Sequence, residues 1–200
     1  MIEEKKYHHG NLKVALIEAG IEMVNEVGEE HLSLRKVAAR CGVSNAAPYA
    51  HFTDKEDMLN AMREYVTDAF MKCLTRASGQ GSGEEKVLMV GREYVLFFHR
   101  NPHYFPFLFS QPCMKINLSL EHAPDNFPPY ELFKSMVLEF NESSGVKPDK
   151  LSLEIEIIQL WAYVHGLTAI SVMKNVTWDE DWEQQILRLL VMRPPENAEL

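Results

Sequence analysis

The sequence predicts an all-α protein, with an N-terminal three-helix head that contains a helix-turn-helix and a C-terminal helical bundle. Long segments carry apolar residues at intervals of three and four, whereas alternating β-branched residues are rare. Glycine and proline divide these segments into helices of ordinary length. Two hundred residues suffice for one large or two small domains, and we expect a head at 1–53 and a body at 54–200.

The first helix is expected at about 11–27, with Leu12, Leu16 and Met23 on one face. Gly28 follows the last periodic residue and can end the helix. Residues 1–11 are polar, and we expect a flexible arm there.

A second helix is expected to begin after Ser33, whose side chain can cap it. Gly42 follows and can take the left-handed conformation that ends a helix. The apolar stripe between them is Leu34, Val37, Ala38 and Cys41.

A third helix is expected at 45–52, with Ser44 as its cap. Pro48 falls at about the fourth helical position, where the loss of an amide costs little. We expect Ala50 and Phe52 to face inward. Small or polar side chains form the outer face, namely Asn45, Ala46, Ala47 and His51. Tyr49 is placed to reach a phosphate.

Two short helices joined by a glycine turn are typical of a DNA-binding helix-turn-helix, whose second helix lies in the major groove. The alternative is that any small helical domain can contain such a pair. The charge distribution favours DNA binding. The chain has a net charge of −9, yet residues 31–55 carry four cations against one carboxylate. A basic head on an acidic body suits a focused contact with phosphates.

The body begins with a helix at about 54–77, which Thr53 or Asp54 can cap, with Glu56 or Asp57 reciprocating. Five prolines break the stretch 103–130 into short helical pieces and loops. Longer helices are expected at 84–100, 129–142, 149–174 and 179–192, followed by a frayed tail at 194–200.

The segment 149–174 is apolar almost all round, and a helix without a polar face must be buried on more than one side. We expect homodimerisation through 149–174 and 179–192. The alternative is a core helix wholly inside one subunit.

Three cysteines lie far apart without a CxxC spacing, which is typical of a reducing compartment. We find no signal peptide and no apolar run near the roughly 20 residues that span a bilayer, so we expect a cytoplasmic protein without membrane contact. The sequence predicts no catalytic residue, no metal site and no cofactor.

The stretch LSLRKVAARCGVSNAAPYAHFTDKEDML at 32–59 resembles the DNA-binding signature of the TetR family of bacterial transcriptional regulators. The segments YHHGNL at 7–12 and WAYVHG at 161–166 resemble the subgroup whose C-terminal domain is named for a Trp-His-Gly motif. The match is specific over residues 7–60 and weaker over the C-terminal part.

This resemblance implies a homodimer that binds a double-stranded DNA operator and senses a small-molecule effector. It implies that Ser33, Ser44, Tyr49, His51 and Lys55 contact phosphates, that Asn45, Ala46 and Ala47 face base edges, and that Arg35 lies close to the groove. Small side chains suit thymine methyl groups, and an asparagine amide can pair with adenine. Only Asn45, Arg35 and His51 could read bases by hydrogen bonds, so some specificity should come from phosphate register and DNA shape. The candidate interface comprises Ser33, Arg35, Lys36, Ser44, Asn45, Ala46, Ala47, Tyr49, His51 and Lys55.

The body is rich in aromatic residues, and an apolar pocket with a few polar groups is the usual form of a small-molecule site. Core packing is the alternative for each aromatic, as a structural role is for His165. The candidate effector-binding residues are Phe97, Phe98, Tyr104, Phe105, Phe109, Phe133, Trp161 and His165.

The sequence thus predicts a transcriptional regulator that an apolar or aromatic ligand releases from a palindromic operator, and we expect it to be a repressor. The alternatives are a protein–protein adaptor of the same fold, or a regulator that senses oxidation through Cys41, Cys73 or Cys113. An enzyme is disfavoured because no P-loop, GxGxxG or HExxH motif occurs.

Overall fold

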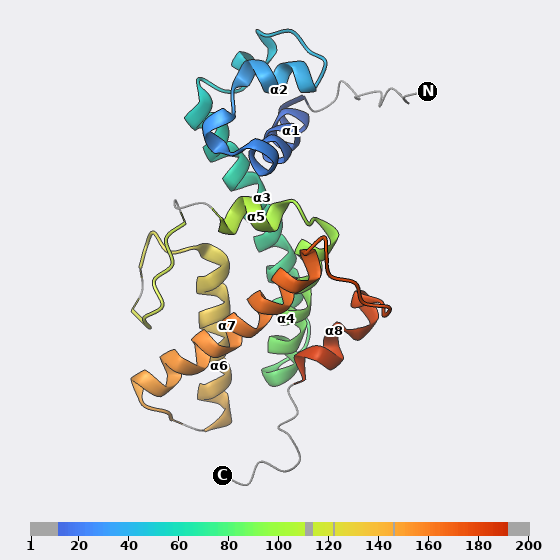
Figure 1. The fold of residues 1–200 in the computed structure, drawn as a ribbon. Helices are drawn as coiled ribbons and strands as arrows, with labels where there is room; N and C mark the ends of the chain where they lie inside the picture. Colours follow the sequence, from blue (N-terminus) through green and yellow to red (C-terminus); the bar gives the residue numbers. More distant parts are fainter. Residues whose placement is uncertain (1–11, 111–113, 122, 146, 192–200) are drawn as a thin grey trace. The chain divides into compact units, whose positions relative to one another are not determined.

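The computed structural model describes residues 12–110, 114–121, 123–145 and 147–191. These residues contain helices and no strands (Figure 1), as predicted. The arm expected at 1–11 and the tail at 194–200 lie outside the described residues. The helices, with two 3-10 helices written η, are α1 Leu12–Val27, η1 Glu29–His31, α2 Leu34–Arg40, η2 Ala47–Ala50, α3 Lys55–Ser78, α4 Gly83–Arg100, α5 Tyr104–Phe109, α6 Pro128–Ser144, α7 Lys150–Val172 and α8 Trp182–Leu190.

The chain packs as two compact units. One contains the described residues up to Asp68 together with 106–110, and the other contains 69–105 and 114–191. Helix α3 belongs to both, because its first part lies in one unit and its last part in the other. The domain boundary at 53/54, drawn from expected function, stays a prediction.

In the first unit, α1 packs against α2 and approaches α3 closely at Gly20. A Cβ atom at Gly20 would lie 2.9 Å from both Met58 Cε and Met62 Sδ. The cap of α3 follows the predicted pattern. Asp54 Oδ1 accepts from the Asp57 amide at 2.9 Å, and Asp57 Oδ2 accepts from the Thr53 amide at 2.7 Å. The start of α3 is therefore fixed by one side chain before the helix, that of Asp54, and by one in its first turn, that of Asp57.

In the second unit, α4 is the central helix, and α6, α7 and α8 all pack on it (Figure 1). Helix α6 ends at Gly145, whose φ of 75° is left-handed, and Asp149 caps α7 by accepting from the Ser152 amide at 3.0 Å. Helix α8 is shorter than the predicted 179–192, because the capping side chain is that of Asp181.

One face of α7 is exposed although it is almost entirely apolar. Leu151 is 64% exposed, Ile155 45%, Ile170 44% and Met173, just after the helix, 54%. These residues follow one another at helical spacing with Gln159, Ala162 and Gly166, which are exposed too. We call Leu151, Ile155, Gln159, Ala162, Gly166, Ile170 and Met173 the α7 stripe.

Candidate nucleic-acid interface and aromatic cluster

Helix α2 begins and ends as its sequence predicts. The Ser33 hydroxyl accepts from the Lys36 amide at 3.3 Å. At the other end, Gly42 has a φ of 67°. The Gly42 amide donates to Ala39 O at 3.1 Å, and the Val43 amide donates to Ala38 O at 3.0 Å. These two bonds form a Schellman motif, which sets the direction of the chain as it enters the turn.

The segment 45–52 is not the α-helix that the sequence was expected to form. It contains turns around the 3-10 helix η2, whose N-cap is Ala46 and which has no side-chain cap bond, so the predicted cap at Ser44 is wrong. The Ser44 carbonyl instead accepts from the Ala47 amide at 3.0 Å. Pro48 explains the difference, because it has no amide to donate. Its carbonyl accepts from the amides of His51 and Phe52, each at 2.9 Å.

The buried residues of this segment are Pro48 and Phe52, the latter 2% exposed. Ala50 is exposed, so the expectation that it faces inward was wrong. Tyr49 is 53% exposed. Of the other candidate residues, some are exposed and some half-buried: exposed are Arg35, Lys36, Ser44, Asn45, Ala46 and His51, and half-buried are Ser33, Ala47 and Lys55.

Two candidate lysines that are far apart in sequence meet at η1. The Lys36 ammonium donates to the carbonyl of His31 at 3.0 Å, and the Lys55 ammonium donates to the carbonyl of Glu30 at 3.4 Å. Within the described chain, neither lysine forms a salt bridge, and neither does Arg35. An ammonium group has three donors, so each lysine keeps hydrogen-bonding capacity for a phosphate.

Arg40, in contrast, is held by α1. Its guanidinium donates to Glu26 Oε2 at 2.6 Å and to Glu22 Oε2 at 3.1 Å. The hydrogen bond to Glu26, together with the charges of Glu26 and Glu22, raises the pKa of Arg40 above its usual value, although burial opposes this. Arg40 therefore joins α1 to α2, and the basic charge that the sequence assigns to this region is smaller than the count suggests.

Lys13 is a neighbour of the candidate site that the sequence reasoning did not assign to it. Its ammonium lies 5.9 Å from the centre of the Phe52 ring, a cation–π distance. The two residues are 39 positions apart, so no local pattern could have indicated the contact.

In the second unit, most of the candidate effector residues form one aromatic cluster. The ring centres of Phe97 and Phe98 lie 5.0 Å apart, those of Phe98 and Phe105 5.3 Å apart, and those of Phe105 and His165 4.9 Å apart. The ring centre of Tyr104 lies 6.0 Å from that of Phe97, and the ring centre of Trp161 lies 5.2 Å from that of His165.

Phe70 also belongs to this cluster although it was not among the predicted residues, because its ring stacks on that of Phe97 with the ring centres 5.0 Å apart. Its place on the apolar side of α3, four residues after Val66 and four before Leu74, was the available signal. Phe133 is buried on α6. Phe109 belongs to the first unit, whereas the other candidate effector residues belong to the second.

One polar pair lies within the cluster. The Tyr94 hydroxyl forms a hydrogen bond with His165 Nδ1 at 3.1 Å. Burial raises the pKa of Tyr94 and lowers the pKa of His165. Both groups are therefore kept neutral.

Two of the three cysteines lie in the described part of the chain, and both thiols have a raised pKa. Burial is the main cause for Cys41 and for Cys73, and the charge of Glu93 adds to it at Cys73. A raised pKa disfavours the thiolate, which is the form that oxidants attack.

The comparisons with known proteins agree on the head. Residues 16–62 match the family model described as bacterial regulatory proteins, tetR family. The tetracycline repressor protein class G of Vibrio anguillarum is 44% identical over 52 residues, which are 26% of this chain and 25% of that protein. This match therefore spans a quarter of the relative's length.

Solved structures match over almost the whole chain. A putative transcriptional regulator from Pseudomonas aeruginosa PAO1 is similar with a TM-score of 0.68 and 19% identity, covering 93% of this chain and 91% of that one. The regulator FadR of Bacillus subtilis in complex with stearoyl-CoA is similar with a TM-score of 0.64 and 16% identity, covering 89% and 97%. Residues 16–62 are therefore similar to the helix-turn-helix domain of the tetR family, and the chain as a whole shares the all-helical fold of these solved regulators.

Proposed function

We propose that this protein is a dimeric, cytoplasmic DNA-binding transcriptional repressor that a small apolar ligand releases from a palindromic operator. The observation that carries the DNA-binding part is the helix-turn-helix of α2 and η2. Side-chain and backbone bonds fix its turn, and Arg35, Lys36 and Lys55 stand free of carboxylates among the described residues.

On DNA, the hydroxyl and cationic groups at the rim position the head, and the small residues before η2 approach the bases. Ser33, Ser44, Tyr49, His51 and Lys55 bind phosphates in this proposal. Arg35 and Lys36 add positive charge close to the groove, and Asn45, Ala46 and Ala47 face base edges. Phosphate contacts fix register, and base contacts give specificity.

We infer that a second copy of the chain covers the α7 stripe. Soluble monomers rarely leave a long apolar face exposed, and two such stripes can pack against each other in a symmetric dimer. Ala162 and Gly166 stand in the middle of the stripe, where small residues allow two helix backbones to approach closely. A Cβ atom added at Gly166 would have no neighbour within 4 Å in its own chain.

By length and composition, α7 is also the one helix in the described residues that could cross a membrane. Its other side packs on α4 and α6, and Glu154 and Glu156 hold contacts to Leu120 N and Asn141 Nδ2 at 3.0 and 3.1 Å. These contacts favour a partner helix over lipid as the cover of the stripe.

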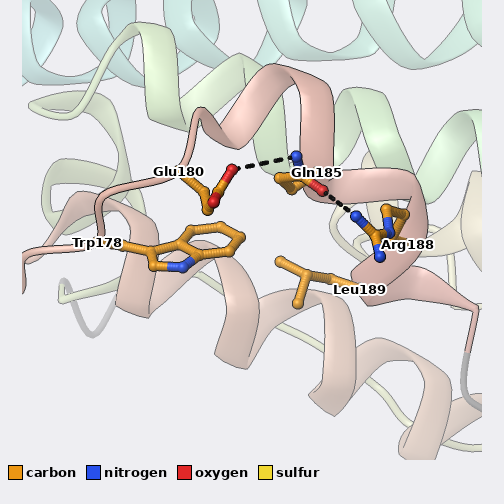
Figure 2. Close-up of a pocket in the computed structure, with 5 residues that line it drawn as sticks. All are labelled: Trp178, Glu180, Gln185, Arg188 and Leu189. Atoms are coloured by element: carbon orange, nitrogen blue, oxygen red, sulfur yellow. Dashed lines mark hydrogen bonds between the residues drawn. The ribbon is translucent and has the colours of Figure 1, made fainter.

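Next to α8 lies a hollow with the composition of an interface. Figure 2 shows Trp178 and Leu189 on one side of it, and a hydrogen-bonded row of Glu180, Gln185 and Arg188 on the other. Gln185 Nε2 donates to Glu180 at 3.4 Å, and Arg188 donates to Gln185 Oε1 at 3.1 Å. The hollow has a volume of about 390 Å³. Exposed apolar side chains beside hydrogen-bonding polar ones are typical of protein interfaces, so we include α8 in the dimer contact.

For the ligand, we propose the aromatic cluster as the site of an apolar or aromatic effector, and place the chain in the Trp-His-Gly subgroup. Trp161 and His165 lie in the cluster, and Gly166 lies in the α7 stripe, so one motif serves both roles. The buried Tyr130 hydroxyl has no hydrogen-bond partner among the described residues, and its ring lies 5.1 Å from that of Trp161. An unsatisfied buried hydroxyl is costly, and a ligand acceptor would relieve this cost.

Release follows from the continuity of α3, which carries Lys55 in its first turn and Phe70 in the cluster. A dimer on a palindrome must hold its two reading elements about 34 Å apart. A ligand that binds better to a form with another separation shifts the population away from DNA. Oxidation is a weaker account of the switch, because the raised pKa values of Cys41 and Cys73 disfavour reactive thiolates. No observation favours an adaptor.

The experiment that tests this function is selection of duplex fragments from genomic DNA by the purified protein. The wild type should enrich fragments that share a palindrome. The variant Tyr49→Ala with Lys55→Ala, both at exposed or half-buried positions, should keep the helical circular dichroism signal and enrich nothing. Equal enrichment by both proteins, or none by the wild type, would contradict the proposal.

A further inference from the structure

A second hollow, in the second unit, combines positive charge with an aromatic floor formed by Phe97. It lies between α3 and the C-terminal end of α4 and has a volume of about 320 Å³. Its lining consists of Ala69, Lys72, Cys73, Arg76, Phe97, Arg100 and Asn101. We call it the α3–α4 cleft. No carboxylate lines it, although the whole chain has a net charge of −9.

The cations of the cleft differ in what holds them. Arg100 donates to Glu183 Oε1 at 2.7 Å and lies 3.7 Å from Glu93. Glu93 is also paired with Arg92. Lys72 and Arg76, one turn apart on α3, are exposed and form no salt bridge with a described residue. Glu93 and Glu183 are thus already engaged by arginines, and neither forms a salt bridge with Lys72 or Arg76.

The aromatic floor connects the cations of the cleft to the aromatic cluster. Phe97 is 9% exposed and lines the cleft, and its ring stacks on Phe70 at 5.0 Å and meets Phe98 at 5.0 Å. Asn101 Nδ2 donates to Phe97 O at 2.8 Å and so fixes the end of α4 beside the floor. A ligand that enters here would meet cations first and aromatic rings next.

We propose that the α3–α4 cleft binds the anionic head of the effector, and that the effector is an amphipathic carboxylate whose apolar tail lies on Phe97. This rests on the proposed effector sensing and names its ligand class. Charge-assisted hydrogen bonds from arginine and lysine are the strong interactions available for a carboxylate. Lys72 and Arg76 lie in the last turns of α3, the same helix that begins at Lys55, so head-group binding acts directly on the helix that leads from the DNA-binding head.

Calorimetric titration with dodecanoate, below its micelle concentration, tests this on the full-length protein without DNA. The wild type should bind dodecanoate and should bind dodecan-1-ol, which has the same tail without charge, at least about tenfold more weakly. The variant Lys72→Gln with Arg76→Gln should lose about tenfold or more in dodecanoate affinity and bind dodecan-1-ol unchanged. Lys147→Gln removes an exposed cation of the same unit outside the cleft and should bind as the wild type does.

Equal binding of the two probes, an unchanged dodecanoate affinity in the double variant, or no binding by the wild type would overturn the ligand class. Because the titration contains no DNA, such a result leaves the operator selection untouched. A failed operator selection with cleft-dependent dodecanoate binding would instead leave the site standing and remove the regulatory role. Circular dichroism of the variants checks that their folds are intact.

Discussion

Lys36 and Lys55 donate to the carbonyl oxygens of two consecutive residues, His31 and Glu30. Helix η1 thus holds two ammonium groups from α2 and α3 close together, although the lysines are 19 positions apart. Both remain available to phosphates, whereas Arg40 is committed to Glu22 and Glu26. This difference between neighbouring cations can be measured.

Replacing Lys55 by glutamine should weaken operator binding and flatten its salt dependence. In a dimer two phosphate contacts are lost, so the slope of log affinity against log salt should become shallower by about 1.8. Arg40→Gln is the matched control, because its charge is already neutralised within the head, and its slope should stay as in the wild type. Fluorescence anisotropy over a salt series measures both; equal slopes for Lys55→Gln and the wild type would exclude a phosphate contact at Lys55.

Replacing Gly42 by valine should abolish operator binding. Its φ of 67° is left-handed, and no atom lies within 4 Å of a Cβ added there. The cost is therefore backbone strain, about 1–2 kcal/mol, and it falls on the turn of the helix-turn-helix. Gly145→Val introduces the same strain at the end of α6, where φ is 75° and the space is equally open, and it should leave DNA binding intact. If both variants bind alike, the turn does not position the interface.

Gly166→Leu should separate the dimer without unfolding the chain. Nothing in the same chain lies within 4 Å of a Cβ at Gly166, and leucine is the better helix former by several tenths of a kcal/mol. A partner helix, however, would meet the new side chain. Ser135→Leu adds the same residue to the exposed side of α6 and should stay dimeric. Sedimentation velocity compares the two; a dimeric Gly166→Leu would place the interface elsewhere.

His165 should make the protein less stable in mild acid. Burial lowers its folded-state pKa below 6.5, so the unfolded chain binds more protons and stability decreases as pH falls from about 6.5 towards the folded pKa. Above pH 6.5 the imidazole is neutral in both the folded and the unfolded chain, so His165 causes no loss of stability there. The glutamine of His165→Gln can still form a hydrogen bond with the Tyr94 hydroxyl, and it does not titrate. Its urea midpoint should therefore change less between pH 7.5 and pH 5.5 than that of the wild type, and an equal change would mean that His165 is not the titrating group.

The helix ends were predictable because they depend on neighbours in sequence. Ser33, Gly42 and Asp54 act on amides and carbonyls within four residues, and each lies where its residue type predicts. The form of residues 45–52 was missed because Pro48 was expected at a helical position where a missing amide costs little, whereas the segment closes with the tighter bonds of η2.

Contacts between distant residues were the part that the sequence could not supply. The pairing of Arg40 with Glu22 and Glu26, and the stacking of Phe70 on Phe97, join different helices. The aromatic residues of the predicted body could be listed from the sequence, but their division between the two compact units could not be predicted. Phe109 was therefore grouped with rings of the other unit. The α3–α4 cleft was missed for the same reason, because its cations come from α3 and from the end of α4.

The most direct test of the central claim is the mass of the complex that the protein forms with a selected palindromic duplex, measured by sedimentation velocity with a labelled duplex. Binding as a dimer should give a complex of one duplex and two 23.0 kDa chains, which Gly42→Val fails to form. A single chain per duplex, or a duplex that sediments alone at every protein concentration, would contradict it.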